Sequence, residues 1–269
     1  MPRPALDHDR LQRALAALLG RDASAVMARK LGGGVSNESY VIEHAGASYV
    51  LRLQRESAGA TLDLVEELEL LRAVAAAGIT AEPLGVDVAT GALLTRFVPH
   101  AVKWMAQAAR DSANIARIAA LLRRLHAVTA RLREFDPVRY AELYVETAAS
   151  IARFGARERQ LAHELRDLAE EYRADYRASV VCHNDLTAGN ILDAGDLMLV
   201  DFEYAASASP VLDLASLAAM NDYDQRQCRE LLRAYFTTAT APISAAEFAK
   251  VVRMVRLIAY FWALASTHE

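Results

Sequence analysis

The pattern of apolar and polar positions changes character along the chain. Leucines recur at helical spacing from Asp9 to Leu19 and stop at Gly20, which predicts an opening amphipathic helix. A second strong helix is predicted over 61–77, ending at Gly78. Short segments with the composition and alternation of strands surround that second helix. They cover 27–31, 38–44, 47–53, 84–88 and 91–97.

The later part of the chain is mostly helical in pattern. An apolar segment over 179–182 is predicted as a strand, and 191–200 as two short strands around an Asp193-Ala194-Gly195-Asp196 turn. With 269 residues, two lobes sharing a cleft are expected, 1–97 rich in sheet and 98–269 mainly helical, an α+β fold. Helices are predicted over 106–129, 138–155, 158–177, 212–220, 225–238 and 245–266.

The most specific chemistry lies between those strands. His183-Asn184-Asp185 is followed by Asn190 and, after the predicted hairpin, by Asp201-Phe202-Glu203. In phosphoryl transfer by kinases, one Asp accepts the proton of the attacking hydroxyl, and an Asn five residues later and a second Asp hold magnesium ions. Asp185, Asn190 and Asp201 stand at those separations. The spacing predicts Asp185 as the catalytic residue, Asn190 and Asp201 as Mg²⁺ ligands, and ATP as the phosphate donor.

Two features of the first lobe suit the nucleotide. Gly32, Gly33 and Gly34 join two predicted strands, and backbone without Cβ lets amide donors approach phosphate oxygens closely. Ser36 and Asn37 are expected to add side-chain donors. The same glycines are also typical of a flexible hairpin turn, and alone they do not decide between the two.

Arg52 stands on the predicted third strand, where a kinase lobe presents its phosphate-pairing Lys. A cation in an apolar strand is costly unless paired. We expect it to reach the phosphates and Glu67 of the following helix, rather than to lie on an exposed strand face. Thr95 and Phe97 fall in the segment expected to receive the adenine.

Three residues near the motif have candidate supporting roles. His183 is expected to hydrogen-bond backbone around the loop rather than to act as the base. Glu203 follows the metal-binding Asp by two residues and is a candidate for orienting it or contacting substrate. Asp213 is consistent both with a helix cap and with a strut for the catalytic loop.

Composition excludes several classes of function. The net charge is −4 with acids and bases interspersed, so no basic footprint for nucleic acid is present. The start of the chain lacks an apolar segment after a basic one, so no secretory signal and a cytoplasmic location are expected. The apolar run 257–265 is about half the length of a membrane crossing, and no membrane insertion is expected. Cys182 and Cys228 are expected to be core residues.

The motif residues resemble a known family. His183-Asn184-Asp185 with Asn190, Val200 to Ala205, and Asp213-Leu214-Ala215 are similar to the choline/ethanolamine kinase branch of the aminoglycoside-phosphotransferase superfamily. Arg52 in place of Lys, and the segment from Leu121 to His126, resemble the same group. The likeness extends from Gly32 to about Tyr235 and implies a bilobal, protein-kinase-like fold.

The resemblance also implies an acceptor class. A small cationic alcohol is expected, with choline or ethanolamine first and thiamine second. Met220 stands where choline kinases typically place an acid, and Asp222, Tyr223 and Asp224 follow it. The late aromatic residues are consistent with a cation cage and equally with core packing. Thiamine kinase, aminoglycoside phosphotransferase and, from another class, a nucleotide-binding pseudokinase or regulator remain alternatives.

Overall fold

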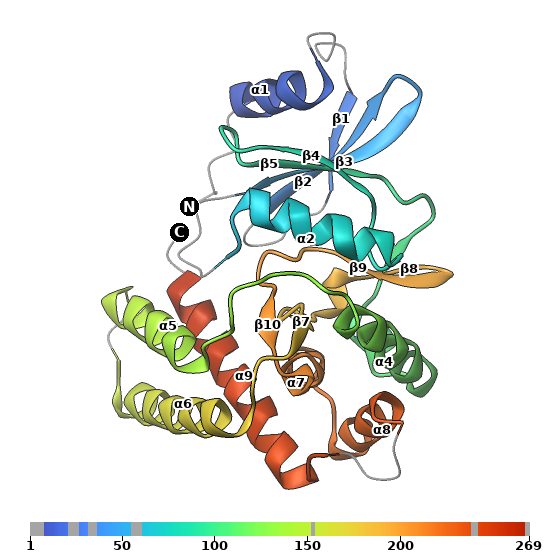
Figure 1. The fold of residues 1–269 in the computed structure, drawn as a ribbon. Helices are drawn as coiled ribbons and strands as arrows, with labels where there is room; N and C mark the ends of the chain where they lie inside the picture. Colours follow the sequence, from blue (N-terminus) through green and yellow to red (C-terminus); the bar gives the residue numbers. More distant parts are fainter. Residues whose placement is uncertain are drawn as a thin grey trace. The chain divides into compact units, whose positions relative to one another are not determined.

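The computed structural model describes residues 8–20, 27–31, 37–54, 61–151, 154–237 and 242–266 (Figure 1). The chain divides into two compact units, Met1–Ala101 and Val102–Glu269. The division falls after Ala101, near the predicted boundary after Phe97.

The first unit contains an antiparallel sheet with the order β1-β2-β3-β5-β4. Helix α1 (His8–Leu19) precedes it, and α2 (Leu64–Ala76) connects its third and fourth strands. Asp63 caps α2 by accepting hydrogen bonds from the backbone of Val65 and Glu66. The strands are β1 (Met27–Lys30), β2 (Asn37–His44), β3 (Ala47–Gln54), β4 (Pro83–Asp87) and β5 (Ala92–Arg96).

Strand β3 shows how the two helices use opposite faces of the sheet. Leu51 and Leu53 are fully buried and pack in one cluster with Leu11 and Leu15 of α1. Alternate residues of a strand point to opposite faces, so Arg52 between them faces the other side. There it pairs with Glu67 of α2. The apolar face thus anchors α1, and the polar contact anchors α2.

The second unit is mainly helical, with two small sheets (Figure 1). Helix α9 packs against α5, α6 and α7, and α4 packs against α8. The helices are α3 (Ala106–Ala109), α4 (Ser112–His126), α5 (Pro137–Ile151), α6 (Ala156–Asp175), α7 (Pro210–Met220), α8 (Gln225–Tyr235) and α9 (Ala245–Ser266). The short strands are β6 (Val102–Lys103), β7 (Val180–Cys182), β8 (Ile191–Ala194), β9 (Asp196–Leu199) and β10 (Ala206–Ala208).

Two parts of this unit differ from the predicted pattern. The helix predicted over 106–129 is broken into α3 and α4, because Asp111 adopts an extended backbone and caps α4 through the N–H groups of Ala113 and Asn114. Strands β6 and β10 were not predicted. Each has only two or three residues and pairs with a strand distant in sequence, β8 and β7 respectively.

The β8–β9 hairpin is as predicted and is fastened to α4. Arg117 of α4 donates to both carboxylate oxygens of Asp193, at 2.6 and 2.9 Å, and to the carbonyl of Gly195 at 2.8 Å. Gly195 has φ +94°, a value that glycine adopts without strain. The hydrogen bond from Arg117, its main cause, lowers the pKa of Asp193 to about 2. The turn that connects the two strands is therefore held at a fixed place on the unit.

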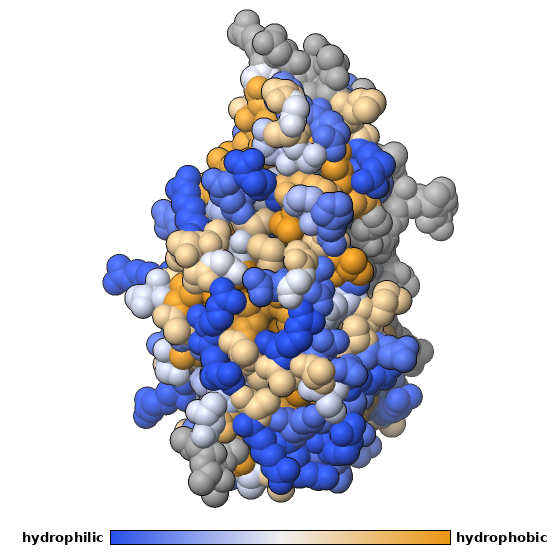
Figure 2. Space-filling model, turned by 90° about the vertical axis from the view of Figure 1, so that its right-hand side faces the viewer, coloured by the Kyte–Doolittle hydropathy of each residue, from blue (hydrophilic) through white to orange (hydrophobic). Residues whose placement is uncertain are grey.

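The surface carries scattered apolar side chains among polar ones, as the face in Figure 2 shows. The large exposed apolar side chains come from separate elements: Met27, Val65, Val88, Val102, Met105, Ile151 and Met220. None of the helices in the described ranges is both long and apolar enough to cross a membrane.

Candidate active site

The loop after β7 presents Asp185, with the short 3₁₀ turn Ala188–Asn190 directly behind it. The Asn190 side-chain amide donates to the Asp185 carboxylate at 2.8 Å and to its backbone carbonyl at 2.9 Å. These bonds use the nitrogen of the Asn190 amide, so its oxygen Oδ1 faces away from Asp185. The structure thus brings the predicted catalytic carboxylate and a predicted metal ligand into contact.

Asp201 follows the other end of the same hairpin. The Val200 N–H donates to the Asn190 carbonyl at 3.0 Å, so Asn190 and Asp201 lie on neighbouring strand ends. Asp201 has φ +69°, a left-handed conformation that is uncommon for residues other than glycine. Burial raises the pKa of Asp185, the charge of Asp201 raises it further, and the Asn190 hydrogen bond opposes the rise. The Asp185 and Asp201 carboxylates therefore lie close enough to repel each other.

His183 links these two parts of the site. Its Nδ1 accepts the Asp185 N–H at 3.3 Å, and its Nε2 donates to the Val200 carbonyl at 3.0 Å. The ring also packs on Phe202, with centroids 4.5 Å apart. His183 is thus a structural residue, as predicted, which ties the backbone before Asp201 to the backbone of Asp185.

Asp213 is a strut and not a helix cap. Ser209 caps α7, and Asp213 lies inside the helix, fully buried. Its Oδ2 accepts the His183 N–H at 2.9 Å and its Oδ1 accepts the Asn184 N–H at 2.8 Å. Burial alone would raise the pKa of Asp213, but the hydrogen bond and charge of His126, the charge of His183 and the Asn184 N–H together lower it. The ionised Asp213 carboxylate therefore holds the backbone of the loop that contains Asp185.

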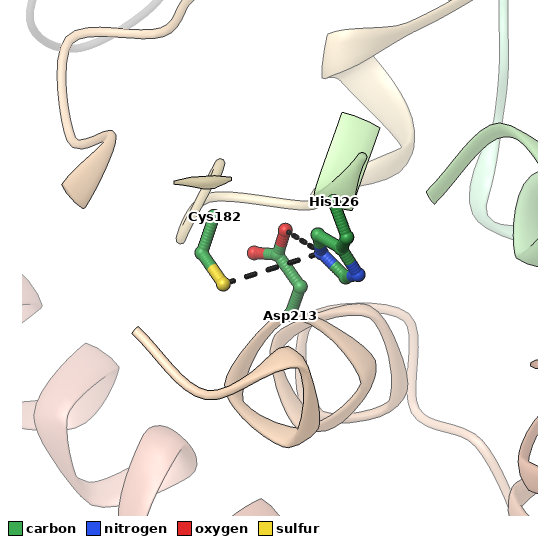
Figure 3. Close-up of side chains that lie close together, drawn as sticks. All are labelled: His126, Cys182 and Asp213. Atoms are coloured by element: carbon green, nitrogen blue, oxygen red, sulfur yellow. Dashed lines mark hydrogen bonds and ion pairs between the residues drawn. The ribbon is translucent and has the colours of Figure 1, made fainter. Parts of the chain in front are cut away.

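Figure 3 shows His126, Cys182 and Asp213 facing one another from α4, β7 and α7. His126 Nε2 lies 3.1 Å from Asp213 Oδ2, and Cys182 Sγ lies 4.0 Å from that nitrogen. A metal ion could be held by this set. Hydrogen bonds already account for the position of the three side chains, because the Cys182 thiol donates to the Ser209 carbonyl at 3.5 Å. Burial raises the pKa of that thiol far above its ordinary value, which disfavours the thiolate that a metal would need. His126 also bonds the Tyr235 hydroxyl at 2.7 Å.

Ser216 and Asn221 support the loop that contains Asp185, a role that the sequence did not assign to either residue. The Ser216 hydroxyl accepts the Leu186 N–H at 3.2 Å and donates to the Asn184 carbonyl at 3.3 Å. The Asn221 amide donates to the Leu186 carbonyl at 2.8 Å. The available signal was a Ser three residues after Asp213, on the same face of an otherwise apolar helix.

The predicted nucleotide residues lie in the first unit. From the sequence, Arg52 was predicted to pair with a glutamate of the following helix, Glu67. The structure pairs these two residues, and both side chains are buried. Asn37 opens β2 and is buried, while Gly32 to Gly34 and Ser36 lie outside the described residues. Thr95 is in β5, and Phe97 follows it with its N–H donating to the Ser48 carbonyl at 3.1 Å. Contact of these residues with a nucleotide stays a prediction.

Tyr144 has acidic and tyrosine side chains near it, Asp185 among them. Burial raises the pKa of Tyr144 on α5 well above its usual range, and the neighbouring Tyr204, Tyr140, Glu203 and Asp185 raise it further. Glu203 is buried, with 2% of its surface exposed, and Tyr204 is partly exposed. The sequence proposed Glu203 for this region, but it did not single out Tyr144 on the distant helix.

The other acceptor candidates have structural contacts. The Tyr223 hydroxyl donates to the Ala109 carbonyl, and its ring is buried. Asp224 caps α8 by accepting the Gln227 N–H at 2.7 Å. Asp222 is exposed, in a left-handed conformation with φ +53°, and Met220 is 36% exposed. Acceptor contact by Asp222 and Tyr223 stays a prediction.

The residues around Asp185 fit a magnesium ion. Mg²⁺ prefers carboxylate and amide oxygens. Asn190 Oδ1 is turned away from Asp185 by the amide's own hydrogen bonds, and Asp201 adds a carboxylate whose charge acts on Asp185. A divalent cation would offset the repulsion between the two carboxylates.

Several known proteins are similar to this chain in sequence or in fold. The chain is 25% identical over 211 residues to protein LicA of Haemophilus influenzae, covering 76% of this chain and 61% of LicA. It thus spans less than two thirds of that relative's length. A choline/ethanolamine kinase family protein from Mesorhizobium loti has 26% identity and a TM-score of 0.74, covering 95% of this chain and 84% of that one.

The choline kinase LicA from Streptococcus pneumoniae has 19% identity and a TM-score of 0.78, covering 96% of this chain and 89% of that one. The predicted α+β fold of the protein-kinase-like type is confirmed by these likenesses. The sequence profile of the phosphotransferase enzyme family matches residues 28–248, most of the chain. The chain therefore belongs to the phosphotransferase enzyme family.

Proposed function

We propose that this phosphotransferase moves the γ-phosphate of ATP to the hydroxyl of a small amino alcohol, with choline or ethanolamine as the first candidates. The observation that carries the proposal is the contact of Asp185 with Asn190, beside Asp201 at the other end of one hairpin. Membership of the phosphotransferase family supports the reaction class. The printed names of the similar structures, a choline kinase and a choline/ethanolamine kinase family protein, support the acceptor class.

Asp185 orients the acceptor hydroxyl and takes its proton. A general base works best when its pKa approaches the working pH, and the raised pKa of Asp185 moves in that direction. Catalysis of phosphoryl transfer depends mainly on positioning the reacting groups and on stabilising the charge of the transferred phosphoryl group. The Asn190 amide bonds keep the Asp185 carboxylate directed, while His183 and α7 hold the backbone on either side.

Asn190 and Asp201 would hold magnesium. When bound, the ion neutralises phosphate charge. The chain's own part is to keep an amide oxygen and a carboxylate at fixed places, which the hairpin does through the Val200–Asn190 hydrogen bond. In the first unit, Arg52 would contact the nucleotide phosphates while Glu67 keeps the guanidinium in place, and Asn37, Thr95 and Phe97 complete the proposed nucleotide residues.

Glu203, Tyr144 and Tyr204 support a cationic acceptor. Tyrosine faces attract ammonium groups, and a carboxylate nearby adds direct charge attraction. Tyr144 lies within electrostatic reach of Tyr204, of Glu203 and of Asp185, the residue that would take the proton of the hydroxyl. They therefore suit a molecule that carries a hydroxyl and a cationic nitrogen close together.

The acidic side chains of this chain suit a large polycationic aminoglycoside less well than a small amino alcohol. Such an acceptor needs several free acids, and the acids of α6 are already engaged. Glu164 pairs with Arg253 at 2.7 Å and Glu171 pairs with Lys250 at 2.6 Å. Glu170 pairs with Arg173 within its own helix. These pairs are consistent with a solvated helix surface rather than a binding face.

The test is a screen of purified protein with Mg·ATP and candidate acceptors. ADP formation is expected with choline, ethanolamine or thiamine and not with kanamycin-type sugars. Turnover confined to an aminoglycoside or a neutral sugar would overturn the acceptor proposal while leaving the reaction class in place. The matched variant is Asp201→Ala, for which magnesium should no longer strengthen ATP binding. An equal magnesium effect in variant and parent would remove Asp201 from the metal site.

A pseudokinase or nucleotide-binding regulator is the alternative of another class. It would bind Mg·ATP without transferring phosphate to any alcohol. The raised pKa of Asp185, together with the Asn190 bond that directs its carboxylate, favours the enzyme, because a directed base serves proton transfer. Binding without turnover across a broad panel of alcohols would favour the regulator.

A further inference from the structure

Helix α7 supplies the hydrogen bonds to the backbone on both sides of Asp185. In Asn184, the residue before Asp185, the N–H donates to the Asp213 carboxylate and the carbonyl accepts from the Ser216 hydroxyl. In Leu186, the residue after Asp185, the N–H donates to the Ser216 hydroxyl and the carbonyl accepts from the Asn221 side-chain amide. Both backbone polar groups of both neighbours are therefore bound by side chains of α7 and its C-cap.

Ser216 has a special place in this arrangement. Its single hydroxyl accepts from Leu186 and donates to Asn184, so one oxygen bridges the two residues that flank Asp185. A hydroxyl can donate one hydrogen bond and accept others, so both contacts form at once. Ser216 is 1% exposed, which leaves water little access to replace either bond.

The backbone that Ser216 bridges is not in a relaxed conformation. Asn184 has φ +66°, in the left-handed region that residues other than glycine seldom adopt. Such a conformation persists where surrounding contacts determine it. Asp213 and Ser216 hold the Asn184 backbone, and its side-chain amide donates to the Tyr204 carbonyl at 3.0 Å.

We propose that Ser216 is a positioning residue, which fixes the direction of the Asp185 carboxylate by bridging Asn184 and Leu186. Asn221 assists it by holding the far side of Leu186. The proposal rests on the proposed kinase function, in which Asp185 receives the proton of the acceptor. Ser216 touches no substrate; it acts through Asp185 alone.

The variant Ser216→Ala tests this directly. Alanine is the best helix former, so α7 is expected to form without the hydroxyl. A misdirected base slows the chemical step and leaves substrate binding almost unchanged. We therefore expect kcat to fall about 5- to 30-fold, with the KM values for ATP and acceptor within about twofold of the parent.

Two matched controls separate positioning from loss of stability. Leu165→Ala removes buried apolar volume from α6, a helix that packs on α5 and α9, and should lower the melting temperature without changing kcat below it. Ser150→Ala removes an exposed hydroxyl that donates to the Thr147 carbonyl within α5 and should change neither quantity. Ser216→Thr retains the hydroxyl and should recover a large part of kcat.

Amide hydrogen exchange gives a readout that needs no acceptor. Loss of the bridge should speed exchange at Leu186, whose N–H then lacks its partner, while exchange in α5 stays unchanged. Unchanged exchange, or a kcat within twofold of the parent, would overturn the proposal. If the parent phosphorylates no alcohol, the kinase proposal fails, and the exchange result still decides whether Ser216 orders the loop.

Discussion

The ion pair of Arg52 with Glu67 and the network around Asp213 hold buried charges in different ways. Arg52 and Glu67 connect a strand and a helix of the first unit by an ion pair, and the second carboxylate oxygen of Glu67 has no hydrogen-bond partner among the described residues. Both oxygens of Asp213 accept hydrogen bonds, from His126, His183 and Asn184. The first arrangement pairs a cation with a carboxylate that keeps one oxygen unbonded, and the second uses both oxygens of a carboxylate to hold backbone and a histidine.

The comparison teaches that a buried charge can be left with acceptor capacity or can be used to order backbone. If Arg52 contacts a nucleotide as proposed, its guanidinium can share charge with phosphate oxygens. The Asp213 carboxylate, with hydrogen bonds on both oxygens, orders three other residues. The variants below break one arrangement at a time.

The largest effect is expected for Asp185→Asn. Asp185 lies in the loop whose backbone the Asp213 network holds. The change removes the base and opens no core cavity, so phosphoryl transfer should fall by about 10²- to 10⁴-fold or more while the fold persists. Turnover measured beside the melting temperature checks this. Near-parental turnover would remove Asp185 from the catalytic role.

Asp213→Asn should rank next, because it puts an amide where backbone N–H groups now meet an anion. Loss of one partner of a buried network costs about 3–5 kcal/mol of unfolding free energy. The pKa of Asp213 is lowered in the fold, so its stabilisation is present above the unfolded pKa of about 3.9 and is lost as pH falls through the folded value. Denaturation of parent and variant at pH 7 and near pH 3 should show the difference shrinking in acid. A constant difference across that range would contradict the ionised strut.

Arg52→Ala should act on nucleotide binding and not on the loop. A hydrogen bond to a charged group contributes about 1.5–3 kcal/mol, so the KM for ATP should rise about 10- to 100-fold with a smaller change for the acceptor. Glu67→Gln is the matched control, since it keeps Arg52 but removes the paired charge. A larger effect on the acceptor than on ATP would place Arg52 outside the nucleotide site.

The smallest effect is expected for Arg117→Ala, which frees the β8–β9 turn from α4. The pair with Asp193 is partly exposed, so the loss should be about 1 kcal/mol or less. The folded pKa of Asp193 is about 2, so the difference between parent and variant should persist above about pH 4 and fade toward pH 2. Denaturant titrations at several pH values measure it. A loss that does not depend on pH would mean that packing, and not charge, fastens the turn.

The sequence predicted well what is local. Asp185, Asn190, Asp201 and the hairpin between them are close along the chain, so spacing alone brought them together. The pairing of Arg52 with Glu67 could also be predicted, because one strand and the following helix contain both. The helices and most strands followed from periodicity for the same reason.

The sequence could not show what depends on distant partners. His126 and Asp213 are 87 positions apart, and Arg117 and Asp193 are 76 positions apart. Ser216 looks like any small residue of an apolar helix until the loop 30 positions earlier is placed beside it. Asp213 remained undecided between cap and strut, because its bonds to the backbone of His183 and Asn184 span 30 and 29 positions.

The packing of α9 on α7 has a consequence for the order of assembly during synthesis. Domains made on the ribosome form as their residues emerge, beginning from the N-terminal side. The sheet of the first unit is complete within residues 27–96, whereas α7, which holds the catalytic loop, packs against a helix that starts at Ala245. A nascent chain can therefore complete the sheet of its first unit early. The loop that contains Asp185 gains its final support only when α9 has been made.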